Sequence, residues 1–571
     1  LWLHAERDQR IEVEHDENHS VGHDRTLTVE GTHTETIKKD TTITVSEGNH
    51  RTTVSQGEQS NTVKGDITVE SQSGKYTLTA ATEITLKVGG GYIKMTPDHI
   101  LVVDQRVDLN PHTVASVLGD GEADCPCKKS PAAGNPVNPM LGIKILPDEV
   151  DFSLPAPAPF VFSRSYASDD ARVGPLGQGW SLGSLSQSLD ITPISVAMTD
   201  PQGRHIAFGP LDPGQERFSE SEVLWLRRGG DAKPWEGRWN FVPEAVQRSE
   251  DCIVALSGGT AEIFSPSASA PSHWLLAQSV DRNGYTTTFR WTPEGFPLCV
   301  RDSANRVFHF RYADIPDRAD RRLSGIARGG APDTEFDPDS EHNDWLVRYT
   351  FDKEGNLAEV ANRAGQTVRR FDYRAHLLVR HRYANGAETC YEYDHYTPQG
   401  RVKAQKEKEG LTRTYSYFPA YTLVSDSLGR TERYDFEGEG GRKRWTGHVA
   451  DDGATKRFEY DSAGRMLRSF DELNRPTRYH RDAEGRIVGS TSPDGAMVSL
   501  ALDEVTGQPT EINTPTGQTR IEYDDRGNPL CVTRPDGAQS RQAYENPALP
   551  DRPTRITDAR GGIKHLVWTP L

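Results

Sequence analysis

An eight-residue aliphatic period near the start of the chain limits what it can fold into. Five residues recur at this interval, Val13, Val21, Val29, Ile37 and Val45, while Thr, His, Asp and Glu fill most of the positions between them. One aliphatic residue in eight cannot build a core from a single copy, because too little apolar surface is available for burial. Several copies wound around a common axis could each contribute one aliphatic residue per turn. The period therefore predicts an intertwined β-helical needle whose core is this octad.

The sequence after Val45 has a similar composition, but its aliphatic residues recur less regularly. Thr and Val remain dense, and both favour strands because branching at Cβ suits a pleated surface. Gly31, Gly48, Gly57 and Gly65 fall where tight corners are expected. We therefore predict that the needle spans residues 1–116.

Two phrases in this segment resemble a known family. LWLHAERDQRIEVEHDENHSVGHDRTLTVEG and GGGYIKMTPDHI are similar to the carboxy-terminal β-helix of VgrG, the spike protein of type VI secretion systems. The resemblance implies a homotrimer that pierces a target envelope and whose spike base, outside this chain, docks on the tail tube. Since the first residue is Leu and no leader follows, we expect a chain cut at its beginning.

Two metal-site candidates lie in and after the needle. His15, His19 and His23 stand four apart and could bind a metal on a threefold axis, but a ladder of polar residues on a solvated face is the favoured interpretation. Residues 117–134 read as a linker rich in Gly, Pro and charge. Its Cys125 and Cys127 lack a second pair of ligands, so we predict no metal there.

Composition excludes several classes of function. The net charge of −17 argues against a nucleic-acid groove or an anionic membrane as main partner, and no apolar run is long enough for a stable membrane anchor. Hydrophobic residues make up 35% of the 571, which favours fibres or thin sheets over thick cores. Six scattered cysteines form no disulfide framework, which fits folding in the bacterial cytoplasm followed by secretion.

A second period, of about ten residues between turns, governs the later chain. The phrases RFEYDSAGRMLRSFDELNRPTRYHRDAEGRIVGSTSPDG and RIEYDDRGNPLCVTRPDG alternate strand-like text with turn residues. Such spacing predicts a continuous antiparallel meander. The acid before each turn can accept backbone amide bonds, and Gly or Asn supplies left-handed geometry. The predicted turn residues are Tyr460, Asp461, Gly464, Arg465, Gly485, Arg486, Tyr523, Asp524 and Gly527.

These phrases are similar to the YD repeats of Rhs and teneurin-like proteins. GNPVNPMLGIKILPDEVDFSLPAPAPFVFSRSYAS also resembles the opening of Rhs shells. The resemblance implies an Rhs amino-terminal region over residues 135–270 and a YD-repeat spiral sheet over 271–571, closed as a hollow shell. Strand text with single Tyr, Phe and Val among charges suggests that neither face is richly apolar. We expect an all-β chain whose shell is incomplete, because the closing motif and toxin usual in Rhs proteins do not precede Leu571.

No catalytic constellation stands out. The acid pairs Asp451-Asp452, Asp503-Glu504 and Asp524-Asp525 sit in predicted turns, where carboxylates cap amides. The acidic stretch 331–344 could hold calcium, although a solvated loop is the favoured interpretation. We predict no catalytic residues, no metal and no cofactor in the residues present.

The leading hypothesis is a type VI spike fused to an Rhs shell that encapsulates and delivers a toxin in competition between bacteria. Its expected partners are two further copies of itself, the tail tube and spike base, the encapsulated toxin, a chaperone and an immunity protein. One alternative is a cell-surface adhesion fibre whose YD repeats bind glycans. A third is an enzyme within the repeats, which would require acids, Tyr or His clustered at matched positions.

Overall fold

The computed structural model describes three stretches of the chain. These are residues 20–64 with gaps at 27, 48, 50, 57, 59 and 61; the strands at 84–88, 91–95 and 100–103; and residues 132–568 with gaps at 202, 317, 319, 331–343 and 439–442. The chain divides into two compact units, residues 1–79 and 80–571. The boundaries expected at 116, 134 and 270 stay predictions. Among the described residues, no helix is long and apolar enough to cross a membrane.

In the first unit, the described residues of 20–64 lie in neither helix nor strand, and each of them is exposed. The octad is no exception, because Val21, Val29, Ile37 and Val45 are 45–51% exposed. A single chain therefore carries neither the core nor the strand ladder that the prediction assigns to several intertwined copies. Val13 lies outside the described residues.

The second unit begins with small sheets. Strands β1 (Ile84–Val88), β2 (Gly91–Met95) and β3 (Ile100–Val103) form an antiparallel meander. A four-stranded sheet follows in the order β4-β5-β6-β9, beside a two-stranded ribbon of β7 and β8. Their bounds are β4 (Val137–Asn138), β5 (Ile143–Ser153), β6 (Val161–Ala167), β7 (Val173–Gly174), β8 (Gly177–Gln178) and β9 (Trp180–Ser181), with the 3₁₀ helix η1 (Gly183–Ser186) after them. We call residues 132–186 the inserted segment.

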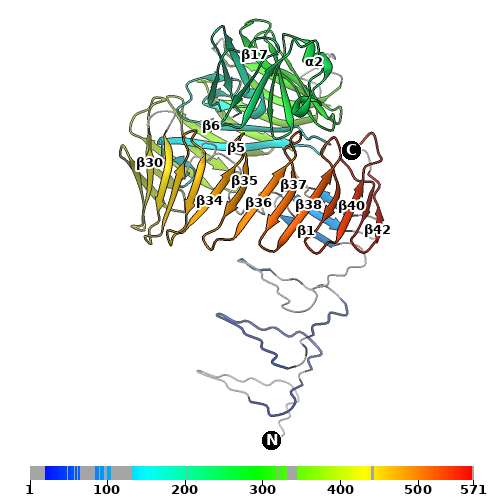
Figure 1. Ribbon diagram of the computed structural model, residues 1–571. Coiled ribbons are helices and arrows are strands. Elements are labelled where there is room, and N and C mark those ends of the chain that lie inside the picture. Colours follow the sequence, from blue (N-terminus) through cyan, green and yellow to red (C-terminus); the bar gives the residue numbers. More distant parts are fainter. Residues whose placement is uncertain are drawn as a thin grey trace. The chain divides into compact units, whose positions relative to one another are not determined.

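All later strands join one antiparallel sheet of 33 strands, in which each strand lies beside its neighbours in sequence (Figure 1). An extra pairing of β10 with β17 closes its first strands into a ring. The ring and the strands after it are β10 (Ser188–Thr192), β11 (Ser195–Thr199), β12 (His205–Phe208), β13 (Glu216–Ser219), β14 (Leu224–Arg228), β15 (Ile253–Ser257), β16 (Thr260–Pro266), β17 (His273–Asp281), β18 (Thr286–Trp291), β19 (Pro297–Arg301), β20 (Val307–Asp314), β21 (Arg321–Gly329), β22 (Asp344–Phe351), β23 (Leu357–Asn362), β24 (Thr367–Arg374), β25 (Leu377–Tyr383) and β26 (Glu388–Tyr393).

The remaining strands are β27 (Val402–Glu407), β28 (Thr412–Tyr417), β29 (Tyr421–Asp426), β30 (Thr431–Glu437), β31 (Arg444–Val449), β32 (Thr455–Tyr460), β33 (Met466–Phe470), β34 (Pro476–Arg481), β35 (Ile487–Thr491), β36 (Met497–Leu502), β37 (Pro509–Thr514), β38 (Gly517–Tyr523), β39 (Pro529–Thr533), β40 (Gln539–Ala543), β41 (Arg555–Thr557) and β42 (Ile563–His565). The helices η2 (Gly237–Trp239) and α2 (Glu244–Arg248) lie between β14 and β15. The all-β fold class and the antiparallel meander predicted from the turn spacing are confirmed.

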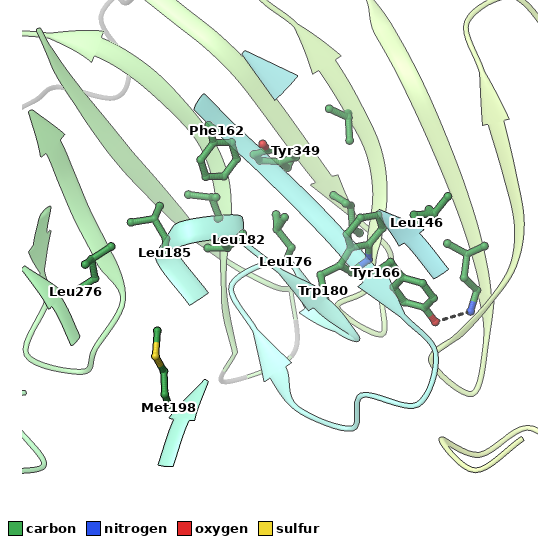
Figure 2. Close-up of a cluster of buried hydrophobic side chains, with 14 of the residues drawn as sticks. Leu146, Phe162, Tyr166, Leu176, Trp180, Leu182, Leu185, Met198, Leu276 and Tyr349 are labelled. Carbon is green, nitrogen blue, oxygen red and sulfur yellow. Dashed lines mark hydrogen bonds between the residues drawn. The ribbon is translucent and has the colours of Figure 1, made fainter. Parts of the chain in front are cut away.

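The main core lies between the inserted segment and one face of the sheet (Figure 2). Aromatic side chains dominate it: the Phe162 ring lies 5.7 Å from that of Phe310, and the Trp180 ring lies 5.1 Å from that of Phe371. Each fully buried side chain of this size contributes roughly 2–3 kcal/mol. The sheet is therefore packed around the inserted segment from the first ring to about β31.

Beyond β31 the two faces of the sheet differ in charge. Paired residues on adjacent strands share a face, so the registers trace each face along the sheet. The face that carries Tyr434 into the core passes through His448, Lys456 and Phe458 and continues through Ser469, Thr477, Tyr479, Ser490, Val498, Leu500, Ile512, Thr519, Ile521, Val532 and Ser540. From Ser469 onward none of these side chains is charged, and Leu500, Ile512 and Ile521 are buried together.

The opposite face holds the charged residues, among them Arg457, Glu459, Arg468, Arg478, Glu511, Arg520, Glu522 and Arg541. Arg468 and Glu459 form a cross-strand ion pair of 2.5 Å, and Arg520 and Glu511 form one of 3.2 Å. The expectation that neither face is richly apolar is wrong for the strands up to β31, because one face of them carries the main core. Beyond β31 the first face mixes Ser, Thr and Tyr with a small aliphatic cluster and is uncharged from Ser469 onward. We call this part of the first face the neutral face.

Candidate functional site

The repeat turns share one set of bonds, shown by the hairpin between β32 and β33. The Gly464 amide donates to the Asp461 carbonyl at 3.0 Å, and the Arg465 amide donates to Asp461 Oδ1 at 2.9 Å. Arg465 Nε also donates to Asp461 Oδ2 at 2.7 Å. Burial alone would raise the pKa of Asp461, but the amide and the guanidinium of Arg465 outweigh it and lower that pKa.

The other predicted turn residues lie in the same arrangement. Asp482 Oδ1 accepts the amides of Glu484 and Arg486, and Asp524 Oδ1 accepts those of Arg526 and Asn528. Among the predicted turn residues the glycines Gly464, Gly485 and Gly527 have positive φ, and the same holds for the turn positions between and beyond them, namely Asn474, Gly495, Gly507, Gly517 and Gly537. The structure brings each Asp, Gly and Arg of one phrase together but keeps separate phrases apart in successive turns.

The tyrosine of each phrase makes a bond across the strands that the sequence did not reveal. Tyr460 lies at the end of β32, past the last paired residue of the β31–β32 ladder, and its hydroxyl donates to the Trp445 carbonyl at 2.5 Å. This bond satisfies a carbonyl that the shortened ladder leaves without an amide donor. The same bond, to a carbonyl 14 or 15 residues back, is made by Trp291, Tyr312, Tyr393, Tyr417, Arg481, Tyr523 and Trp568.

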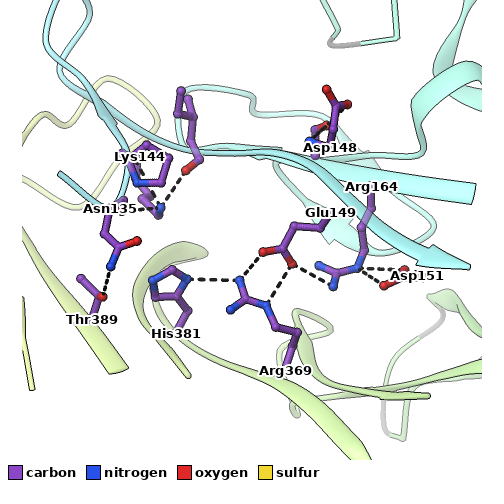
Figure 3. Close-up of polar contacts among 12 residues, drawn as sticks. Asn135, Lys144, Asp148, Glu149, Asp151, Arg164, Arg369, His381 and Thr389 are labelled. Carbon is purple, nitrogen blue, oxygen red and sulfur yellow. Dashed lines mark hydrogen bonds and ion pairs between the residues drawn. The ribbon is translucent and has the colours of Figure 1, made fainter. Parts of the chain in front are cut away.

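A buried charged network joins the inserted segment to the sheet (Figure 3). Arg164 is 1% exposed and lies 2.9 Å from Glu149 and 3.0 Å from Asp151. Arg369 of β24 donates to Glu149, and Tyr349 of β22 donates to Asp151 at 2.6 Å. Burial raises the pKa of Asp151 although Arg164 opposes the shift. The paired charges leave no open carboxylate for acid–base chemistry and instead fix the inserted segment in place.

A polar chain continues this network toward the start of the inserted segment. Lys144 is fully buried, and its Nζ donates to the carbonyls of Ile145, Asn135 and Pro136 at 2.7, 2.9 and 3.3 Å. Burial lowers the pKa of Lys144 despite the nearby Glu149. Burial, with Lys144 and Arg369, lowers the pKa of His381 to about 2, so this ring is neutral.

The direction of the bonds around His381 follows from Arg369, which can only donate. Arg369 lies 3.3 Å from His381 Nδ1, which therefore accepts and leaves the ring proton on Nε2. Nε2 in turn lies 3.3 Å from the Tyr391 hydroxyl, which donates to the Asn135 carbonyl. This series of hydrogen bonds thus ends on the backbone of the inserted segment and holds the segment against β24–β26.

The remaining candidates from the sequence are scattered. His23 and Asp24 contact each other at 3.6 Å on a fully exposed stretch, while His15, His19, Cys125, Cys127 and residues 331–343 lie outside the described residues. Asp452 and Asp503 accept backbone amides in turns, as Asp524 does. In the part of the chain that the structure describes, no group of three or more His, Cys, Asp or Glu could hold a metal ion.

Sequence reasoning missed the buried network entirely. Its signal is a run of charges inside strand-like text, Lys144, Glu149, Asp151 and Arg164, where a buried strand should be apolar. The partner of Glu149 comes from residue 369, and nothing local indicates that pairing.

Three family models match parts of the chain. Residues 1–88 match the bacteriophage T4 gp5 C-terminal trimerisation domain, residues 134–208 match a domain of unknown function (DUF6531), and residues 460–497 match the RHS repeat. The last match falls on the turn phrases of Asp461 and Asp482. A spike-type segment and an Rhs repeat region therefore occur in one chain.

Curated relatives match over longer stretches. "Toxin protein Tse5" of Pseudomonas aeruginosa is 44% identical over 494 residues, which are 84% of this chain and 36% of the relative. "Double-stranded DNA deaminase toxin A" of Burkholderia cenocepacia is 28% identical over 54% of this chain and 20% of its own length. "Probable deoxyribonuclease RhsB" of Dickeya dadantii is 26% identical over 74% of this chain and 27% of its own. The chain thus spans between a fifth and about a third of these relatives.

Among solved structures, the "Crystal Structure of TcdB2-TccC3" covers 69% of this chain and 22% of that one, with a TM-score of 0.34 and 12% identity. A second neighbour, the "Structure of the N-terminal domain of effector protein SpvB from Salmonella typhimurium strain LT2", covers 54% of this chain with a TM-score of 0.17.

Proposed function

We propose that this chain, a VgrG-like spike segment fused to an Rhs repeat region, is the carrier part of a type VI secretion effector. The observation that carries the proposal is the joining, in one chain, of a match to a trimerisation domain over residues 1–88 and a continuous repeat sheet with an uncharged face. Covalent fusion would send the contents of the shell out whenever the spike is fired.

The names of the relatives support a carrying role. One is named a deaminase toxin and another a probable deoxyribonuclease, yet both share sequence with this chain over a minor part of their own lengths. Proteins with two different enzyme names would share this sequence if the shared part transports the enzyme and has no enzyme activity of its own. Enzyme activity would then lie outside the shared part, and no catalytic residue is proposed in this chain.

The remaining elements of the proposal concern assembly and location. Residues 1–116 would form a homotrimeric needle that meets the spike base and tail tube. The inserted segment would close one end of the shell, since its buried network fixes it against the sheet. The protein would fold in the bacterial cytoplasm, with a chaperone and an immunity protein as further partners, and leave for a target cell.

The native mass of the 571-residue chain, compared with a chain that lacks residues 1–116, tests the proposal. We expect a trimer that becomes a monomer on truncation, because the octad can be buried only between copies. A full-length monomer would contradict the spike assignment and favour the adhesion fibre. A truncated chain that remains trimeric would move the assembly interface to the repeat sheet.

A further inference from the structure

Strands β32–β42 meet the first part of the sheet along one line of turns. The turns that follow β34, β36, β38 and β40 lie along one edge of the sheet (Figure 1). Each of them forms a hydrogen bond with η2 or with the β17–β18 turn. We call this line the seam. Its members are Arg238, Arg282, Asn283 and Tyr285 on one side and Glu484, Val505, Asn528 and Asp551 on the other.

The seam consists of one polar contact per turn. Arg238 forms an ion pair with Glu484, Nη1 to Oε2 at 2.9 Å, and Arg282 donates to the Val505 carbonyl at 2.5 Å. Asn528 donates to the Asn283 side chain at 3.3 Å, and the Tyr285 hydroxyl donates to Asp551 at 2.5 Å. Successive hairpins thus dock one after another on the same short edge.

No apolar cluster of described residues spans the seam. The main cluster ends on the sheet at Phe436 and its packed neighbour Trp445, and the cluster under η2 and α2 uses residues 225–280. The cluster of Leu500, Ile512 and Ile521 draws all its members from residues 487–532. Strands before β31 are fastened to the inserted segment by aromatic packing, whereas the aromatic contact of β32–β42 with earlier strands is that of Phe458 with Trp445, at 4.7 Å between ring centroids.

Few contacts join β31 to β32, the position about which β32–β42 could turn. β31 and β32 pair through three residues each, Gly447 to Arg457, His448 to Lys456 and Val449 to Thr455. Beyond them the strands are joined by the Tyr460 hydroxyl at the Trp445 carbonyl and by the contact of the Phe458 and Trp445 rings, both of which lie at the turning point itself. If β32–β42 turn about this pairing, the hydrogen-bond ladders among these strands stay intact.

We propose that the seam is the line along which the wall of the shell opens, with β32–β42 moving as one flap about the β31–β32 pairing. A typical polar contact contributes only about 1 kcal/mol net, because the bond within the protein replaces bonds to water. The Arg238 and Glu484 side chains are 25% and 26% exposed, and the buried Arg282 Nε has no partner among the described residues. Opening exposes the neutral face without breaking any aromatic core. That such an opening serves release of contents rests on the proposed carrier function, whereas the motion itself does not.

Hydrogen–deuterium exchange of the intact 571-residue chain tests the flap. Reversal of one charge, Arg238→Glu or Glu484→Arg, should speed exchange in β34–β41 by about tenfold, because attraction at the seam becomes repulsion. Exchange in β22–β26 should stay unchanged. The double reversal, Arg238→Glu with Glu484→Arg, should return β34–β41 to within about twofold of the original rates.

The matched control is Arg413→Glu, whose ion pair with Glu407 is similarly exposed, at 22% and 29%, but lies off the seam. It should leave exchange in β34–β41 unchanged. The unaltered chain offers a second measurement, since a rise from about 0.05 to 1 M salt should speed exchange in β34–β41 selectively by screening the seam. Equal acceleration in β22–β26, or unchanged β34–β41 rates in both the reversals and the salt series, would overturn the proposal.

Discussion

At the scale of single residues, the tyrosine before each turn acts as a hydrogen-bond donor as well as an apolar side chain. Tyr460→Phe keeps the ring and removes the donor to the Trp445 carbonyl. A carbonyl left without its partner costs about 1 kcal/mol, so we expect amide exchange at the ends of β31 and β32 to rise about fivefold. Tyr421→Phe is the control, because no hydrogen bond of the Tyr421 hydroxyl is seen among the described residues. Equal rates in both variants would mean that the tyrosine serves by packing alone.

A second residue-scale prediction concerns the turn glycines, which differ in what surrounds them. Gly453 and Gly485 both have φ near +85°, so an alanine at either position meets the same backbone strain of about 1–2 kcal/mol. At Gly453 nothing lies within 4 Å of the added carbon, whereas at Gly485 the added carbon would clash with Arg465 Nη1. Arg465 can move away only by loosening its bond to Asp461.

Gly485→Ala should therefore cost about 0.5–1 kcal/mol more than Gly453→Ala. Native-state cleavage by trypsin after Arg465 and Arg486 measures the difference, because the protease cuts locally opened chain. Cleavage that rises no further in Gly485→Ala than in Gly453→Ala would show that the arginine adjusts without loss.

At the scale of elements, β24 offers neighbouring arginines on opposite faces of the sheet. Arg369 binds Glu149 of the inserted segment, whose side chain is 16% exposed, and Arg370 pairs with the half-exposed Glu359. Arg369→Met leaves a carboxylate buried with one partner fewer, which should cost about 3 kcal/mol or more. Arg370→Met should cost less than about 1 kcal/mol. Urea unfolding followed by circular dichroism compares them, and similar midpoints would show that the inserted segment does not depend on this network.

The elements also show how far local sequence determines this fold. The turns could be predicted because Asp, Gly or Asn and Arg of one phrase bond within five residues of one another. The neutral face could not, because the ladder shifts register beside Tyr460 and beside Arg481, and each shift breaks the simple alternation of faces. The network around Glu149 joins residues about 220 apart in sequence, beyond any periodic signal.

At the scale of the whole molecule, the amino-acid composition indicated a thin sheet but did not indicate how apolar residues are distributed between its two faces. Low hydrophobic content fits a sheet with few thick cores, and the structure puts most of its buried apolar side chains in one cluster around the inserted segment. A smaller cluster of Leu500, Ile512 and Ile521 lies on the neutral face. Average composition cannot separate this arrangement from a sheet polar on both sides, because both use the same residues.

The last prediction concerns the octad, whose residues are not buried in a single chain, so that burial does not identify them as a core. Val29 and Thr28 are both exposed in the single chain, so their surroundings do not distinguish them. The eight-residue period does: it places Val29, and not Thr28, on the common axis of the proposed trimer. Val29→Asp would bring three carboxylates to one level of that axis, where burial of unpaired charge costs several kcal/mol. Native mass spectrometry should then find mainly monomer for Val29→Asp and trimer for Thr28→Asp. A trimer in both variants would remove Val29 from the core, and monomers in both would mean that the interface tolerates no added charge and that the octad is not its specific core.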